Sequence, residues 1–251
     1  MKFYNSIFTL FLLFSIPAFV ACEEGEEPED PNTGTGTLHD AFADFDEDNT
    51  TIYLDGSDVV VETNGLPNHT TPYWGQGHSL YVDPTVATNM TPTVITDRAD
   101  ISGTLRVSSS PELASSSTST SLGPIGIAVS GAYIYNDQEG GGALSSAIVS
   151  LDYSGGHIGP DLYHYHLEPA AFSQDDEKLV GILADGFFIY GRKCNSTGTY
   201  PTDLDASGGH VATTQHSDGE EYHYHIENEL YINEYYIIFP GNYQGTPSRI
   251  N

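Results

Sequence analysis

The sequence predicts a mostly β domain of short strands with few short helices. Short runs rich in β-branched residues, such as 58–63 and 93–96, are separated throughout by glycine, proline and asparagine. No stretch has the apolar spacing of a long amphipathic helix. One pattern occurs twice, which predicts an internal two-fold duplication. The chain has 251 residues, 12% of them aromatic, which is enough for a single domain with a substantial core.

The duplicated unit is defined by the tetrapeptide Tyr-His-Tyr-His, which stands at residues 163–166 and 222–225. Each copy follows a Leu-Asp pair and a Ser-Gly-Gly-His segment. Both units begin with an apolar strand, a glycine turn and an aromatic strand, and they span about residues 126–168 and 181–227. Two copies are too few for a solenoid, so we expect one domain, residues 38–251, with pseudo-two-fold character.

Each tetrapeptide, read as a strand, presents its two histidines on one face and its two tyrosines on the other. Two imidazoles on one face can reach a single metal ion, and the Gly-Gly-His segment adds a third. The histidines that share this pattern, and that we predict as metal ligands, are His157, His164, His166, His210, His223 and His225. Three imidazoles suit a Zn ion with a fourth position left open, and they suit Cu at least as well. The tyrosines are expected to pack behind the strand.

The arrangement of the two histidine sets stays open at this point. Each unit can form its own three-histidine site, or the units can face each other with both His-x-His strands near the pseudo-two-fold axis. Duplication followed by pseudo-symmetric packing favours the facing arrangement. Asp152 and Asp205 precede the Gly-Gly-His segments and are candidates for metal ligands or for acceptors of the second N–H of a ligand histidine. His69 is a candidate for a further ligand. Cys194 is either a ligand, a reactive thiol or an inert loop residue.

An acidic residue that occurs in only one unit is a candidate general acid or base. Asp185 stands where the first unit has Ser130, so it breaks the equivalence of the two units. The alternative is a turn residue before Gly186.

Three hypotheses for the function follow, and whether the chain is an enzyme stays open. The first is a metal-dependent enzyme, hydrolytic with Zn or oxidative with Cu, with a cleft and an open coordination position. The second is a metal-binding or metal-delivery protein. The third is a carbohydrate-binding protein with a structural His-Tyr core, in which aromatic residues such as Tyr73 and Trp74 stack on sugars.

The first 37 residues predict secretion and a lipid anchor. Residues 1–21 combine Lys2 with an apolar run, as in a signal peptide, and end in a segment that resembles a lipoprotein cleavage site before Cys22. Residues 22–37 are acidic and then rich in glycine and threonine, which predicts a flexible tether. The acidic run resembles the surface-export signal of Bacteroidetes lipoproteins. We therefore expect an outer-membrane lipoprotein of the bacterial cell envelope, exposed at the surface if the run acts as such a signal.

The charge of the chain narrows the choice of partners. Lys and Arg number 7 against 35 Asp and Glu, for a formal net charge of −28. This balance argues against nucleic acid and anionic membrane surfaces and favours cations. Polysaccharide stays a second partner class. Because the sequence shows no nucleophile elbow, phosphate-binding loop or dinucleotide-binding fingerprint, several enzyme classes are removed.

The paired Tyr-His-Tyr-His motifs, each preceded by a Gly-His step and a loop, resemble the YHYH domain family of bacterial extracytoplasmic proteins. Further segments that fit are 64–69, 185–191, 204–210 and 239–246, so the resemblance covers roughly residues 55–250. The resemblance implies an extracytoplasmic location but no established activity. Related sequences often have Cys-Asn-Gly-His where this chain has Ser-Gly-Gly-His, so no role for a cysteine at that place is implied.

Overall fold

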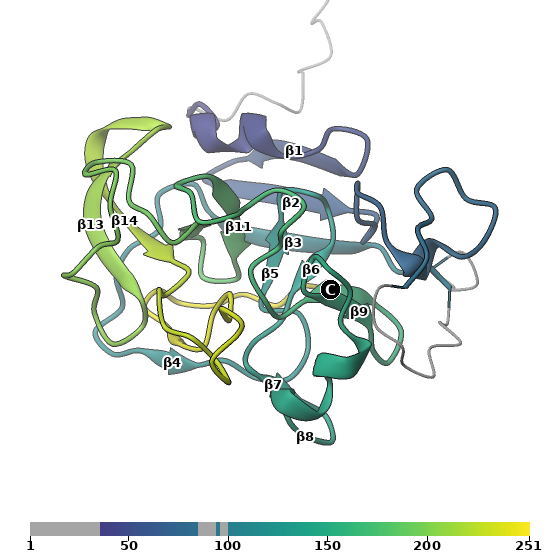
Figure 1. The fold of residues 1–251 in the computed structure, drawn as a ribbon. Coiled ribbons are helices and arrows are strands. Elements are labelled where there is room, and N and C mark those ends of the chain that lie inside the picture. The colour runs from purple at the N-terminus through teal and green to yellow at the C-terminus, as the bar shows by residue number, and fades with distance from the viewer. Residues whose placement is uncertain (1–35, 85–93, 96–99) are drawn as a thin grey trace, which may run out of the picture. The chain divides into compact units, whose positions relative to one another are not determined.

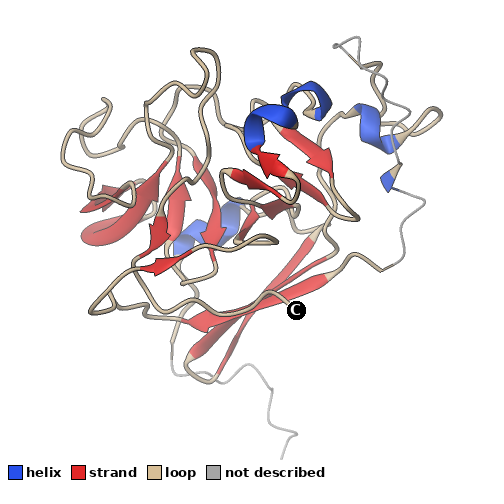
Figure 2. Ribbon diagram, turned by 90° about the horizontal axis from the view of Figure 1, so that it is seen from below, coloured by secondary structure: helices blue, strands red, loops and turns tan. Residues whose placement is uncertain are grey.

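The computed structural model describes residues 36–84, 94–95 and 100–251, which form a mostly β domain (Figure 1). The expected signal peptide and almost all of the expected tether lie outside the described residues. Figure 2 shows that the helical segments are short turns among many strands. Those described are the 3-10 helices η1 (Asp40–Asp44), η2 (Pro72–Trp74), η4 (Leu144–Ser146) and η5 (Ile148–Ser150). The mostly β prediction with few short helices is confirmed. None of the described helices is long and apolar enough to span a bilayer.

A small antiparallel sheet has the strand order β1-β2-β3. Its strands are β1 (Thr50–Asp55), β2 (Asp58–Thr63) and β3 (Gly103–Ser108). The hairpin between β1 and β2 turns at Gly56, whose φ of +65° is a conformation that glycine adopts without strain. Alternate residues of β3 are buried, as expected for a strand with one face on a core.

The larger sheet has eight strands in the order β13-β14-β12-β11-β5-β6-β10-β9. Their bounds are β5 (Gly126–Ala128), β6 (Tyr133–Ile134), β9 (Gly156–Ile158), β10 (Tyr163–Tyr165), β11 (Leu179–Leu183), β12 (Phe188–Tyr190), β13 (Gly209–Thr214) and β14 (Ser217–His225). Two short pairs complete the strands, β4 (Thr118–Ser119) with β15 (Asn242–Tyr243) and β7 (Gln138–Glu139) with β8 (Gly142–Ala143).

The two halves of the large sheet have the same sequence of parallel and antiparallel pairings, counted outward from the central strands. β5 and β11 are antiparallel to each other, and each is followed by an antiparallel, then a parallel, then an antiparallel neighbour. This is the order that the expected duplication would produce, and the duplication itself stays a prediction. Gly126 and Gly181 occupy matching places where the central strands approach closely, because a Cβ atom at either would meet the backbone of the facing strand.

The His-x-His strands lie toward the two ends of the large sheet. In Figure 1, β13 and β14 lie at the left and β9 lies at the right. The arrangement with both His-x-His strands near the axis is therefore wrong. The central places are taken by β5 and β11, whose side chains are all buried, because apolar strands gain most from cover on both faces.

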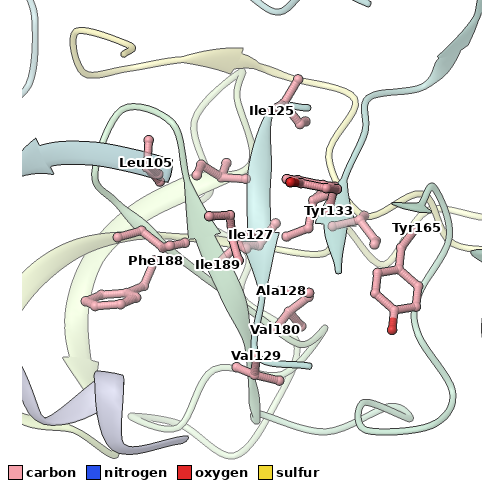
Figure 3. Close-up of a cluster of buried hydrophobic side chains, with 14 of the residues drawn as sticks. Leu105, Ile125, Ile127, Ala128, Val129, Tyr133, Tyr165, Val180, Phe188 and Ile189 are labelled. Atoms are coloured by element: carbon pink, nitrogen blue, oxygen red, sulfur yellow. The ribbon is translucent and has the colours of Figure 1, made fainter. Parts of the chain in front are cut away.

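One hydrophobic cluster contains residues of both sheets (Figure 3). Leu105 of the small sheet joins Ile127 and Ile189 of the large sheet, and all three are fully buried. Tyr165 of the first tetrapeptide and Tyr224 of the second are also in this cluster with no exposed surface. Complete burial of an apolar side chain of this size contributes about 1.5–3 kcal/mol. The tyrosines thus anchor the histidine strands to the core, as expected.

Candidate metal centres

Two groups of four side chains bring their ligand atoms together, one toward each end of the large sheet. We name them the Glu cluster and the Cys cluster after the residue in which they differ. The Glu cluster consists of Glu139, His157, His164 and His166, and the Cys cluster consists of Cys194, His210, His223 and His225. Within each cluster the four ligand atoms lie within 4.8 Å of one another. All six histidines that the sequence singled out are therefore present, and each unit forms its own group.

Strand pairing places two histidines of each cluster opposite each other. His157 of β9 pairs with His164 of β10, and His210 of β13 pairs with His223 of β14. The third histidine follows two residues later on the same face, because side chains alternate along a strand. The Gly-Gly-His and Tyr-His-Tyr-His segments thus form one antiparallel pair in each half of the sheet.

The ligand atoms of the Glu cluster are spaced like those of a small coordination shell. His164 Nε2 lies 3.1 Å from His157 Nε2 and 2.9 Å from His166 Nε2. Glu139 Oε1 lies 3.0 Å from Nε2 of both His157 and His166. Nitrogen ligands at about 2.0–2.1 Å from a tetrahedral Zn ion are about 3.3 Å apart. A slight expansion of the four atoms is enough to surround an ion of that size.

Backbone carbonyls fix the tautomers of two histidines in the Glu cluster. His164 Nδ1 donates to the carbonyl of Leu162 at 3.0 Å, and His166 Nδ1 donates to the carbonyl of Asn136 at 2.6 Å. A carbonyl oxygen can only accept, so the proton of each neutral ring is on Nδ1. Each Nε2 therefore presents a lone pair to the centre of the cluster.

A serine fixes the third tautomer of the Glu cluster. His157 Nδ1 lies 2.8 Å from Ser150 Oγ, and Nδ1 is the donor because the hydroxyl of Ser150 donates to the carbonyl of Ala147. Burial lowers the pKa of His157 to about 4 and lowers the pKa values of His164 and His166 as well. All three rings are thus neutral at pH 7 with Nε2 unprotonated.

The centre of the Glu cluster consequently holds four acceptor atoms that face one another. Glu139 Oε1 is buried and has no hydrogen-bond donor among the described residues. Its contacts with the two Nε2 atoms bring acceptor against acceptor. Buried lone pairs in this arrangement cost free energy unless a cation lies between them. Three imidazole nitrogens and a carboxylate oxygen are ligands that Zn and Cu ions take in proteins.

The Cys cluster repeats the carbonyl contacts of the Glu cluster. His223 Nδ1 donates to the carbonyl of Glu221 at 3.0 Å, and His225 Nδ1 donates to the carbonyl of Gly191 at 2.7 Å. Nε2 of His223 lies 3.1 Å from Nε2 of His225. Burial lowers the pKa of His223 to about 4 and that of His225 to about 3, so both rings are neutral at pH 7.

A thiol completes the Cys cluster, and a carboxylate outside it orients the third histidine. His210 Nδ1 donates to Asp203 Oδ1 at 2.9 Å, so Nε2 of His210 also points its lone pair inward. Cys194 Sγ lies 3.5 Å from that Nε2, and Cys194 is fully buried. Three imidazoles and one thiol form a ligand set for zinc or copper, because a metal ion binds the thiolate form.

The fourth member of each cluster is what reasoning from the sequence missed. No motif marks Glu139 as a ligand, and the sequence leaves three roles open for Cys194. Both follow an aligned tyrosine by four residues, Tyr135 in the first unit and Tyr190 in the second. Extending the alignment of the two units by four residues would have paired them. Glu139 and Cys194 each stand at the fourth coordination position, beside three histidines.

Asp152 and Asp205 are in neither cluster, and neither accepts from a ligand histidine, so both expected roles are wrong. Asp152 Oδ1 accepts from the backbone N–H of Ser154 at 2.8 Å and of Gly156 at 3.2 Å. Asp205 makes the same two bonds in the second unit, also at 2.8 and 3.2 Å. The two carboxylates therefore hold the tight turns that carry the Gly-Gly-His segments.

Replacing Asp152 by alanine is expected to lower the free energy of unfolding by about 2–3 kcal/mol. Asp152 Oδ2 accepts from the hydroxyls of Thr71 at 2.6 Å and Tyr163 at 2.7 Å, and Tyr163 is buried, so its hydroxyl would lose its acceptor. Asp205→Ala is the matched control, because the Tyr222 hydroxyl that Asp205 accepts from is near solvent. Urea unfolding of both variants measures whether Asp152→Ala loses more stability than Asp205→Ala. An equal loss of unfolding free energy in the two variants would contradict this account.

His69 and Asp185 lie on the tyrosine side of the two motifs. His69 Nε2 accepts from the hydroxyl of Tyr165 at 2.7 Å, so the expectation of a ligand role for His69 is wrong. Asp185 Oδ2 accepts from the hydroxyl of Tyr224 at 2.6 Å and from the N–H of Gly245 at 3.0 Å. Burial raises the pKa of Asp185. These contacts give Asp185 a place in the packing, and its role as a general acid or base stays a prediction.

The two aromatic residues on which the sugar-binding hypothesis was based are covered. Tyr73 and Trp74 are only 4% and 8% exposed. Trp74 Nε1 donates to the carbonyl of His69 at 3.0 Å, and its ring stacks on His78 with 4.1 Å between centroids. The polysaccharide alternative thus has no support from the residues on which it was based.

A cavity of about 320 Å³ lies apart from both clusters. Its lining is largely apolar, with Phe42, Val107 and Phe188 among the residues, and includes the pair of His39 and Glu221, whose Nε2 and Oε2 are 2.9 Å apart. None of the eight cluster residues lines it. This cavity is therefore not the cleft beside the metal ligands that the enzyme hypothesis expects.

Comparison with known proteins gives one match. A family model described as "YHYH protein" matches residues 104–203. The matched region contains the first Tyr-His-Tyr-His segment, the whole Glu cluster and Cys194, and it ends before His210 and the second tetrapeptide. Neither the curated proteins nor the solved structures contain a match to the chain. Residues 104–203 are therefore identified as a YHYH domain, which supports the family resemblance of the Tyr-His-Tyr-His motif.

Proposed function

We propose that this chain is a lipid-anchored protein of the bacterial cell envelope that holds two transition-metal ions, zinc or copper, one in the Glu cluster and one in the Cys cluster. The anchor is Cys22 in this proposal, and it rests on the sequence of residues 1–37 alone. An extracytoplasmic domain meets both metals without the buffering of the cytosol, so metal supply does not decide between them.

The orientation of the six imidazoles is the observation that supports metal binding most directly. Every Nδ1 is occupied as a donor to a carbonyl, a hydroxyl or a carboxylate. Every Nε2 consequently points a lone pair at its cluster centre. In a hydrogen-bonded His-Tyr core, each acceptor atom would face a donor. In these centres, three Nε2 acceptors instead face one another and a fourth atom, which is a carboxylate oxygen in one cluster and a thiol sulfur in the other. A bound cation satisfies all of them at once.

The number of protein ligands favours holding a metal over catalysis with it. Structural zinc sites have four protein ligands, whereas catalytic sites have three and keep one position for water or substrate. Glu139 and Cys194 each supply a fourth atom within reach of the three nitrogens. Storage, delivery or stabilisation by metal is therefore the function that this geometry supports best. An enzyme would need Glu139 or Cys194 to leave the metal during turnover.

Metal analysis of the full chain, purified without a polyhistidine tag and reloaded with Zn, is expected to give two ions per chain, one for each cluster. His164→Ala with His166→Ala is expected to retain one, and so is His223→Ala with His225→Ala. His39→Ala with His78→Ala is the control that removes two histidines outside the clusters, and it should keep both ions. A folded wild-type chain that retains no metal, or a control that loses as much as the cluster variants, would refute the proposal.

A further inference from the structure

We infer that the two clusters divide metals by softness, with Cu(I) taken by the Cys cluster and Zn(II) by the Glu cluster. This inference rests on the proposed function, because it names which ion each centre takes. It follows from a comparison of the two clusters position by position.

The two centres are equivalent in all but one ligand. Each has three imidazoles that present Nε2 to the centre, and each receives its fourth atom from the residue four positions after an aligned tyrosine. The carbonyl of Asn136 orients His166 in the first half, and the carbonyl of Gly191 orients His225 in the second. The exchange of Glu139 for Cys194 is thus the difference at the metal itself.

This one exchange changes the chemistry of the site. A carboxylate oxygen is a hard ligand and favours divalent ions, whereas a thiolate sulfur is soft and favours Cu(I) along with Zn(II). When both ions are present, Cu(I) is therefore expected to occupy the thiolate site, and Zn(II) is left with the site that has a carboxylate.

Both centres have carboxylates beyond their four ligands. Asp137 and Asp161 act on His166 and Tyr135 near the Glu cluster, and Asp203 Oδ1 lies 2.9 Å from His210 Nδ1 at the Cys cluster. These outer charges do not separate the two centres, so the comparison depends on the fourth ligand. In the Glu cluster this ligand is a buried, hard oxygen of a carboxylate, which favours a dication.

The Cys cluster buries its sulfur completely and places a hydroxyl beside it. Cys194 has no exposed surface. The hydroxyl of Ser196 lies 3.1 Å from Sγ, where it can donate to a thiolate. A monovalent ion and one thiolate are together neutral, and a neutral pair costs less free energy in a buried site than a net charge does.

The test exchanges the two residues. The metal-free full chain is mixed without oxygen with Cu(I) and Zn(II), each at two equivalents per chain so that either ion can fill both clusters, and the retained metals are measured together with the thiolate-to-copper charge-transfer absorption. The wild type is expected to retain about one Cu and one Zn per chain. Cys194→Glu is expected to lose the copper and the absorption band and to bind a second Zn. Glu139→Cys is expected to bind a second Cu in place of Zn.

Each outcome decides between the claims. Wild-type and exchanged chains that bind Cu and Zn in equal mixtures at both centres would overturn the division of metals and leave the proposed function intact. Chains that retain neither ion although their unfolding transitions are cooperative would overturn both. If Cys194→Glu does not fold, Cys194→Ser with a small polar side chain gives the same test, because it removes the thiolate alone and should lose the copper and the absorption band.

Discussion

Removing the metal is expected to lower the free energy of unfolding by about 4 kcal/mol for each cluster, when the reference sample contains free ion at about 1,000 times Kd. An ion that binds the folded chain more tightly than the unfolded chain stabilises the fold by mass action. The metal-free chain also keeps four acceptor atoms facing one another in the Glu cluster. Urea unfolding with zinc and with a chelator measures the difference.

Variants that lack one cluster are the control for this result. His164→Ala with His166→Ala should respond to the chelator with about half of the wild-type change, since only the Cys cluster then contributes. His223→Ala with His225→Ala should give the reciprocal half. Chelator-treated and zinc-loaded wild type that unfold at the same urea concentration would contradict the account, because two bound ions must appear in the stability.

Replacing Asp185 by alanine is expected to lower the free energy of unfolding by about 2–5 kcal/mol. The Tyr224 hydroxyl and the Gly245 N–H would both lose their acceptor, and Tyr224 is fully buried. Ser130→Ala is the matched change in the first half and should cost about 1 kcal/mol. In that half, Tyr165 still donates to His69 Nε2 after the serine hydroxyl is removed. Equal losses of unfolding free energy in the two variants would contradict the prediction that Asp185 stabilises the fold more than Ser130 does.

The pH dependence of Asp185 has a definite sign. Burial raises its pKa in the folded chain above the ordinary value of 3.8. Its protonated form therefore favours folding, and this stability is present below pH 3.8 and is lost as the pH rises through the folded pKa. Asp185→Asn, which cannot ionise, should lack this loss, so its stability relative to wild type should increase from about pH 4 upward. A relative stability that is flat over this range would contradict the raised pKa.

Much of the site was predictable because it is local. The tetrapeptides and the Gly-Gly-His segments are short, and alternation along a strand is enough to place His164 and His166 on one face with Tyr165 on the other. The mostly β class followed from the same local signals, namely short runs between glycine and proline. Each of these predictions depends on residues only a few positions apart.

What could not be predicted depends on contacts between distant segments. Glu139 and Cys194 hold matching places in the alignment of the two units, but their side chains differ, and only the pairing of β6 with β10 and of β12 with β14 shows that each lies beside the histidines. The predicted role of Asp152 was wrong because the carboxylate accepts hydrogen bonds from backbone N–H groups of its own turn, which lie nearest to it. The placement of the histidine strands away from the axis was likewise decided by the burial of β5 and β11.

The most direct test of the central claim is X-ray diffraction from zinc-loaded crystals, recorded above and below the zinc absorption edge. The account predicts two anomalous peaks per chain, one for each cluster. The first should be bonded to Glu139 and to Nε2 of three histidines, and the second to Cys194 Sγ and three further Nε2 atoms. Ordered crystals without anomalous density at either cluster, or density bonded through Nδ1, would contradict it.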